Sequence, residues 1–276
     1  MQPLLSIVIA NYNYGRFLEE AIQSVLSQSC DDYELIIVDG GSTDNSVEII
    51  KKYEDKIAWW VSEKDKGQSD AFNKGFAHAN GKYLTWLNAD DILVDGCLGK
   101  VVVELQKYPE CEWFTGNFFR FLDNGQIMEI NWGPHYYPKF LQRRTSPIVV
   151  FGPSTFFAKS LWERAGRIDE RFHLAMDTEL WARFITMGIT QRRINVFVWA
   201  FRMHERSKTA EFGNHCLSDE HQERFRIEDS MIYEKTKYRT SSIMHFLILC
   251  WRVFDGSIFK RYLLRLSVKK INFSHK

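Results

Sequence analysis

Two adjacent carboxylates, Asp90 and Asp91, follow an apolar run at 82–87 that indicates a buried strand. Side by side at a strand end, these groups repel each other and lose hydration unless a positive group lies next to them. Such a pair can hold a hard divalent cation, which prefers oxygen ligands and keeps positions open for phosphate. Paired acids are also common at turns and helix N-termini, so the pair alone leaves both interpretations open.

The elements that would position this pair repeat a strand–helix pattern. Continuous apolar runs at 6–10, 34–38 and 57–61 indicate strands buried on both faces, and segments with helical periodicity follow them. Three such repeats within the first 90 residues predict an α/β fold with a doubly wound, mostly parallel sheet flanked by helices.

Polar residues gather at the predicted strand ends. Asn11, Asp39 and Asp90 each follow a buried run, and ligands of doubly wound sheets bind beyond the carboxyl ends of the strands. No G-x-G-x-x-G motif follows the first strand, and no G-x-x-x-x-G-K-[ST] motif occurs anywhere. The sequence therefore carries neither a dinucleotide fingerprint nor a P-loop.

The overall composition limits the class of protein. The 276 residues are 45% hydrophobic and 15% aromatic, which supports a packed core and excludes a largely disordered chain. The net charge is +1, so nothing global favours a nucleic-acid partner. Five cysteines without a C-x-x-C pair fit reduced thiols, and no run reaches the roughly 18–20 apolar residues of a membrane span. We expect a cytoplasmic protein.

The charge is concentrated near the C-terminus. Residues 239–276 contain eight Lys and Arg residues and one acid, Asp255. This basic segment is either an ordinary packed helix with a solvated face or an anchor on the anionic inner face of a membrane.

Several motifs together resemble the family 2 glycosyltransferases. The nucleotide-sugar-binding half of that family is similar to SIVIANYN at 6–13, ELIIVDGGSTDNS at 34–46 and the segment 65–91. The acceptor and catalytic half is similar to residues 156–188. The resemblance covers about residues 4–210 and implies a GT-A fold and inverting chemistry.

The resemblance also implies a domain division. Residues 1–210 would form the GT-A domain, with the nucleotide-binding half at 1–95 and the acceptor half at 96–210. Residues 211–276 would form a basic, helical C-terminal extension.

The resemblance implies contacts with the nucleotide sugar. The residues expected to make them are Ala10, Tyr12, Asp39, Asp70, Asn88, Asp90 and Arg202. Ala10, Tyr12 and Asp39 would line the base pocket, and Arg202 would neutralise phosphate. Two positions depart from the commoner family pattern: Asn88 replaces the first acid of Asp-x-Asp-Asp, and Gly40 replaces the second acid of Asp-Asp-Gly-Ser. The base of the donor therefore stays open.

A divalent metal, Mn²⁺ or Mg²⁺, would be the positive partner of the acid pair. By the resemblance, Asp91 would be its main protein ligand, with Asp90 and His204 as further ligands. His204 has an ordinary structural interpretation as well.

Asp177 matches the base position of the family. Inverting transfer is a single displacement, so one carboxylate must deprotonate the acceptor hydroxyl. Asp177 starts a predicted helix at 176–188, and a helix N-terminus would keep the pKa of its carboxyl low. A first-turn acid that only stabilises the helix is the alternative.

The sequence thus predicts metal-dependent transfer of a sugar from a nucleotide diphosphate to a glycan or lipid-linked acceptor, in surface polysaccharide synthesis. A sugar-phosphate nucleotidyltransferase and a non-catalytic nucleotide-sugar-binding homologue are the alternatives.

Overall fold

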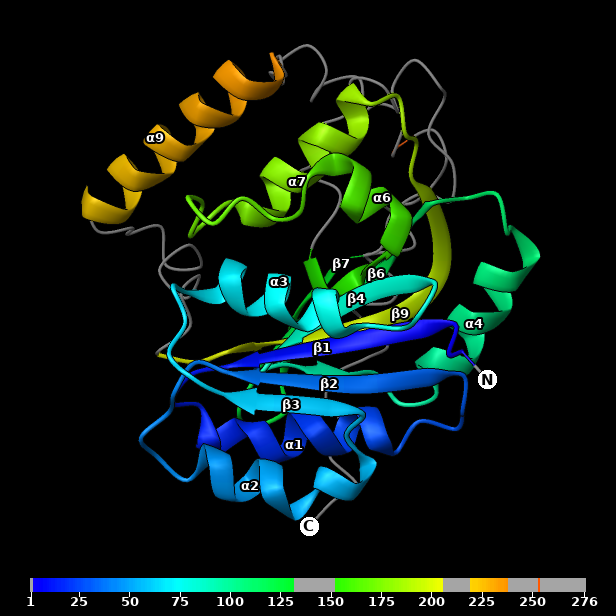
Figure 1. Ribbon diagram of the computed structural model, residues 1–276, viewed down its shortest axis with the longest axis vertical. Coiled ribbons are helices and arrows are strands. Elements are labelled where there is room, and N and C mark those ends of the chain that lie inside the picture. The colour runs from blue at the N-terminus through cyan, green and yellow to red at the C-terminus, as the bar shows by residue number, and fades with distance from the viewer. Residues whose placement is uncertain (1, 132–151, 206–218, 238–252, 254–276) are drawn as a thin grey trace.

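The computed structural model of the chain contains one sheet of nine strands with helices on both faces (Figure 1). The main path through the sheet is β3-β2-β1-β4-β8-β6-β9-β5, and β7 pairs with β6 beside it. The structure describes residues 2–131, 152–205, 219–237 and 253.

The first half of the chain forms the parallel part of the sheet. Its strands are β1 (Leu5–Asn11), β2 (Tyr33–Asp39), β3 (Trp59–Ser62) and β4 (Tyr83–Asn88). The register places Asn11 beside Asp39 and Ala10 beside Asn88, so the polar strand ends lie at one edge. This arrangement confirms the predicted fold class.

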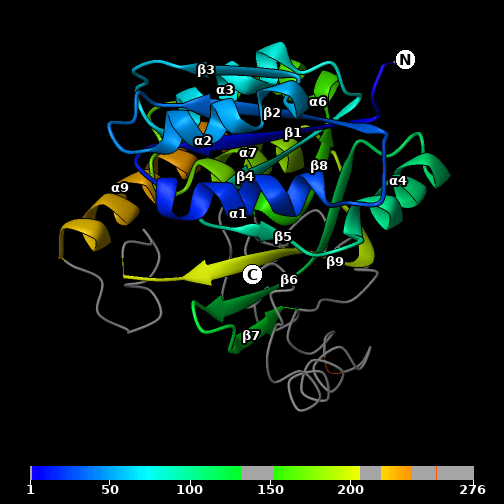
Figure 2. The ribbon, with the colours of Figure 1, turned by 90° about the horizontal axis from the view of Figure 1, so that it is seen from below.

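Three helices connect these strands and cover both faces of the sheet. Figures 1 and 2 show α1 (Gly15–Leu26) and α2 (Ser46–Lys52) on one face and α3 (Gln68–His78) on the other. Helix α1 buries Phe17, Leu18, Ala21, Ile22 and Val25, the apolar stripe that its sequence spacing sets on one side. The crossover helices thereby bury the apolar strands between them.

The second half adds antiparallel strands to the same sheet. Strand β8 (Thr155–Ala158) pairs antiparallel with both β4 and β6 (Trp113–Leu122), while β9 (Arg192–Met203) runs parallel to β6. A tight turn containing Gly125, at φ 81°, joins β6 to β7 (Ile127–Asn131). The short strand β5 (Ile92–Leu93) pairs with β9 directly after the acid pair, and α4 (Cys97–Lys107) follows it.

Helix α7 (Met176–Thr186) is held on the sheet by aromatic side chains. Trp181 stacks on Trp86 of β4 with ring centroids 5.6 Å apart, and it meets Phe157 of β8 edge-on. All three side chains are almost completely buried. Aromatic pairs of this geometry add to the free energy of area burial, so α7 is fixed on β4 through its second turn. Helix α6 (Lys159–Ala165) precedes it.

Helix α9 (Asp219–Thr236) packs against α7 (Figure 1). Apart from Val253, the basic segment 239–276 lies outside the described residues, and the domain division at residue 210 stays a prediction. Within the described ranges, no helix is long and apolar enough to span a bilayer. Cys30, Cys97 and Cys111 carry free thiols.

Two helical glycines provide a matched test of the packing. A Cβ at Gly75 in α3 would overlap Val8 of β1, whereas a Cβ at Gly99 in α4 would meet nothing closer than Ser29 O at 3.6 Å. We expect Gly75→Ala to lower the free energy of unfolding by about 1–3 kcal/mol through overpacking. Gly99→Ala should raise it by up to about 1 kcal/mol through helix propensity. Urea denaturation measures both, and a stabilising Gly75→Ala would contradict this packing.

Candidate functional site

The two adjacent acids at the end of β4 have different environments. Asp91 is fully buried; its Oδ1 accepts the backbone N–H of Arg202 at 2.9 Å, and its Oδ2 accepts the amide of Asn88 at 2.8 Å. Burial raises the pKa of Asp91 well above the ordinary value, and the charge of Asp90 adds to that rise. Asp91 therefore organises the strand end, in contrast to the expectation that it is the main metal ligand.

Asp90 lies at the rim with His204. The Oδ2 atom of Asp90 is 3.0 Å from Nε2 of His204, which directly follows β9. The side chain of Asp90 is 14% exposed. The imidazole of His204 is held between two rings, with centroids 4.6 Å from Phe17 and 5.8 Å from Tyr14. The structure thus brings together two of the three residues expected to bind a metal.

Arg202 is buried, and its guanidinium is committed to the protein. Its Nε donates to the carbonyl of Asp90 at 2.9 Å, Nη1 donates to Asp123 Oδ1 at 3.3 Å, and Nη2 is paired with Glu20. The side chain is 5% exposed. These contacts do not fit the expected role in neutralising phosphate. Arg202 instead joins the acid loop to α1 and to the β6–β7 turn.

The ends of β1 and β2 are joined by a buried carboxylate. Asp39 accepts hydrogen bonds from Asn11, from Ser62 and from both the backbone and hydroxyl of Ser42, and it is completely buried. These four donors occupy both oxygens, so Asp39 holds the ends of β1 and β2 together and does not fit the expected direct contact with a base. Tyr12, which directly follows β1, is 59% exposed and free to stack on a ligand. Ala10 lies half-buried within β1.

Helix α3 begins beside the acid loop. Gln68 Nε2 donates to Asn88 Oδ1 at 2.7 Å, which fixes the amide that replaces the usual acid. Asp70, in the first turn of α3, accepts the backbone N–H of Lys66 at 3.0 Å and lies 3.6 Å from Lys74 Nζ. Asn88 thus has protein partners on both its oxygen and its nitrogen.

Asp177 lies in the first turn of α7. Its Oδ1 accepts the backbone N–H of Thr178 at 2.7 Å, and the backbone N–H of Gly152 also donates to the carboxyl. Burial raises the pKa of Asp177 despite these donors. The expectation of a low pKa from the helix N-terminus is therefore wrong, because desolvation outweighs the helix dipole here.

The loop before α7 is tied to α3. Asn73 exchanges two hydrogen bonds with the backbone of Ile168, at 2.8 and 2.9 Å, and Ser69 Oγ donates to the carbonyl of Phe172 at 2.9 Å. Since α3 also holds Asn88 through Gln68, the same helix positions both the acid loop and the segment leading to Asp177.

A buried carboxylate from α9 holds the other side of that loop. Glu228 is 2% exposed, and its two oxygens accept the backbone N–H groups of His173, Leu174 and Ala175 at 2.8–3.0 Å. Three consecutive amides ahead of the first turn of α7 are thereby satisfied by one side chain.

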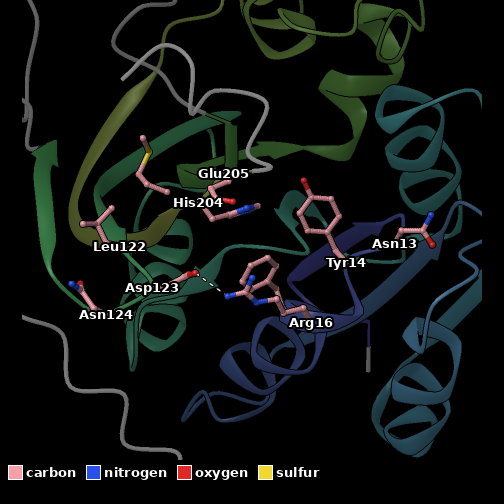
Figure 3. Close-up of a pocket in the computed structure, with 10 residues that line it drawn as sticks. Asn13, Tyr14, Arg16, Leu122, Asp123, Asn124, His204 and Glu205 are labelled. Atoms are coloured by element: carbon pink, nitrogen blue, oxygen red, sulfur yellow. Dashed lines mark hydrogen bonds and ion pairs between the residues drawn. The ribbon is translucent and has the colours of Figure 1, made fainter. Parts of the chain in front are cut away.

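A pocket of about 670 Å³ opens beside His204. Figure 3 shows Tyr14 at the start of α1 and His204 and Glu205 at the end of β9 around the hollow. The ion pair between Arg16 and Asp123, at 3.2 Å, joins α1 to the β6–β7 turn along another side (Figure 3). The volume is in the usual range of small-molecule sites.

The capacity of the rim to hold a cation rests on Asp90 and His204. The described part of the chain contains no group of three or more His, Cys, Asp or Glu side chains arranged to hold a metal. A hard cation needs six or more ligands, and it commonly takes one or two from protein and the rest from phosphate and water. Asp90 supplies one such carboxylate at the rim, and His204 would add a nitrogen ligand beside it.

Sequence reasoning did not identify Glu20, Asp123 or Glu228 as contributors. Each is one of many acids in the chain, and its partner lies at least 53 residues away in sequence. Asp123 is part of an Asp-Asn-Gly sequence that is typical of a turn, which says nothing about a contact with Arg202.

Comparisons with known proteins agree with this arrangement. The family profile described as "Glycosyl transferase family 2" matches residues 6–164. An uncharacterized glycosyltransferase of Nostoc sp. is 43% identical over 106 residues, covering 37% of this chain and 33% of that protein.

Solved structures share the fold. TarS of S. aureus, in complex with UDP-GlcNAc, superposes with a TM-score of 0.59 at 16% identity over 75% of this chain and 60% of its own. A mannosyltransferase of Pyrobaculum calidifontis, in complex with GDP-Man and Mn²⁺, gives 0.58 at 18% identity over 76% and 60%. The chain therefore spans a third to three fifths of the length of these three proteins.

Glu228 provides a test of how the loop before α7 is held. We expect Glu228→Ala to lower the free energy of unfolding by at least about 1–3 kcal/mol, because buried amides lose their acceptor. Glu223→Ala, on the same helix but 64% exposed, should change it by no more than about 0.5 kcal/mol. Denaturant unfolding measures the free energy of unfolding of both variants. An equal loss in Glu228→Ala and Glu223→Ala would contradict the role of Glu228.

Proposed function

The chain belongs to glycosyltransferase family 2, and we propose that it transfers a sugar from a nucleotide-diphosphate donor to a hydroxyl of a glycan or lipid-linked acceptor. The donor would lie across the carboxyl ends of β2, β1 and β4, which the register aligns at one edge. Membership of the family follows from the match to residues 6–164.

The contact between Asp90 and His204 carries the proposal. It is the one place at this edge where a carboxylate with exposed surface and an imidazole meet, at 3.0 Å, among the residues described above. A diphosphate at β4 would share these two side chains with a divalent cation, Mn²⁺ or Mg²⁺. When bound, that cation neutralises the negative charge that develops on the leaving diphosphate.

The protein's own groups supply orientation. Arg202 and Asn88 fix the backbone and carboxylate of the acid loop, so Asp90 needs little rearrangement when the donor binds. Preorganised charge of this kind costs no reorganisation during the reaction. Gln68 ties the same loop to α3, which borders the donor sugar in this proposal.

Asp177 would act as the base. In a single displacement, the acceptor oxygen attacks the anomeric carbon while its proton passes to the Asp177 carboxylate, and the bond from that carbon to the diphosphate oxygen breaks. Desolvation makes this carboxylate a stronger base than an exposed aspartate. The result would be inversion at the anomeric carbon.

The nucleotidyltransferase alternative finds little support in the loop after β1. Residues 12–14 carry no cation, and the nearest one, Arg16 in the first turn of α1, is paired with Asp123 and borders the pocket beside His204. A non-catalytic homologue would bind the nucleotide sugar but transfer no sugar, so a measurement of sugar transfer by the wild type distinguishes it. The setting in surface polysaccharide synthesis and the attachment of the basic segment 239–276 to a membrane remain parts of the proposal.

Asp177→Asn tests the base. We expect kcat for sugar transfer to fall by about 10²- to 10⁴-fold with the donor dissociation constant unchanged, because the amide cannot accept a proton. Asp229→Asn, an exposed change of the same kind on α9, should leave transfer unchanged. In wild type, kcat should decline as pH falls through a pKa above the usual value of about 3.9. Near-normal transfer by Asp177→Asn would remove the assigned base.

Asp90→Asn tests the metal site. We expect Mn²⁺ to strengthen nucleoside-diphosphate binding by a factor at least about 10- to 100-fold smaller than in wild type. Loss of a residue that only supports a metal ligand already lowers metal affinity by about that factor. Titration calorimetry with UDP and GDP, with and without Mn²⁺, measures it. Asp95→Asn, exposed and four residues beyond Asp91, is the matched control. An unchanged metal dependence in Asp90→Asn would place the cation elsewhere.

A further inference from the structure

A carboxylate fills the space beside Gly40 at the end of β2. A Cβ built on Gly40 would lie 2.6 Å from Oδ2 and 3.0 Å from Cγ of Asp65, and its three nearest atoms all belong to that side chain. Gly40 does not have a positive φ, so the backbone itself would accept another residue there. The side chain of Asp65 thus occupies the position that a side chain at residue 40 would take.

The Asp65 carboxylate has one oxygen in use. Oδ1 accepts the backbone N–H of Gly67 at 2.8 Å, and no described residue donates to Oδ2. Burial raises the pKa of Asp65, and the nearby charges of Asp70 and Asp39 add to the rise. A half-buried carboxylate with an unused oxygen gains free energy when a ligand donates a hydrogen bond to it.

The position of Asp65 relative to Asp90 indicates which part of a ligand it meets. Asp65 belongs to the connection from β3 to α3, and its carboxylate lies beside Gly40, directly after β2. Asp90 follows β4, and the strand order β2-β1-β4 puts the ends of β2 and β4 two strand spacings apart, about 10 Å. A donor whose diphosphate lies at Asp90 would extend its nucleoside across β1 towards β2. The exposed ring of Tyr12, at the end of β1, lies between them in this order and offers a stacking face.

We propose that Asp65 contacts the nucleobase of the donor and selects bases that present a ring N–H, as uracil and guanine do. This inference deepens the proposed function and rests on it. An ionised carboxylate can only accept hydrogen bonds. Cytosine and adenine present a ring-nitrogen lone pair at the corresponding edge, which the carboxylate repels.

The test is titration calorimetry of UDP, GDP, CDP and ADP with Mn²⁺ present. We expect wild type to bind UDP or GDP at least about 10-fold more tightly than CDP and ADP, because a hydrogen bond to a charged group contributes about that factor or more. Asp65→Asn should remove most of this preference. Glu63→Gln, in the same loop and with the same change of charge, should keep it.

A rescue variant separates recognition from folding. Gly40→Asp alone should weaken binding, because two carboxylates would compete for one space. Gly40→Asp combined with Asp65→Ala should restore the preference, since the carboxylate then comes from β2. A preference retained by folded Asp65→Asn, or one not restored by the double variant, overturns the inference alone. Failure of every diphosphate to bind wild type overturns the proposed function and the inference with it.

Discussion

The buried guanidinium of Arg202 is the contact on which the arrangement of the site depends. The end of β4 carries two adjacent acids, and the backbone N–H and Nε of the same arginine bind the carboxylate of Asp91 and the carbonyl of Asp90. Glu20 and Asp123 balance its charge from two other elements. The arginine side chain is 5% exposed while its two carboxylate partners are each 41% exposed, so removing either partner would leave a desolvated charge less well balanced. Arg202 fixes β9 against the acid loop, and therefore His204 against Asp90.

The position of Asp177 depends on different forces. Apolar packing of Trp181 on Trp86 seats α7 on β4, and hydrogen bonds from α3 and from Glu228 fix the loop in front of it. Behind the first turn, Glu179 and Arg183 form a buried pair, with Lys235 of α9 on the same carboxylate. Strand β4 carries Asp90 at its end and Trp86 within it, so one strand sets the separation between the acid pair and the base.

The sequence was sufficient for the parallel half of the sheet because the relevant signals are local, whereas β8 pairs antiparallel with β4 and β6 over distances that no local pattern shows. Buried apolar runs and helical stripes predict strands and helices one at a time, and a helix between successive strands predicts a parallel sheet whose polar ends coincide. It was less informative about roles. Asp39, Asp91 and Arg202 have the residue types of ligand contacts, but the structure shows their polar atoms occupied by partners up to 182 residues away. Similarly, the sequence shows that position 40 lacks a carboxylate, and only the fold shows that Asp65 brings one there.

The acids at the carboxyl ends of the parallel strands fall into two kinds, according to whether one or both carboxylate oxygens accept hydrogen bonds from the protein. Asp39 and Asp91 are fully buried with donors on both oxygens, so any change of ligand would have to break protein contacts first. Asp65 and Asp90 are partly exposed, and each has only one oxygen engaged by the described protein groups. A hydrogen-bond donor or cation of a ligand gains most free energy when it binds a desolvated carboxylate oxygen that has no protein partner. Asp65 lies beside Gly40 after β2, and Asp90 follows β4, with β1 between the two strands. A molecule that binds both acids must therefore have a cation-binding end and a hydrogen-bond-donating end about two strand spacings apart. A nucleoside diphosphate has that form.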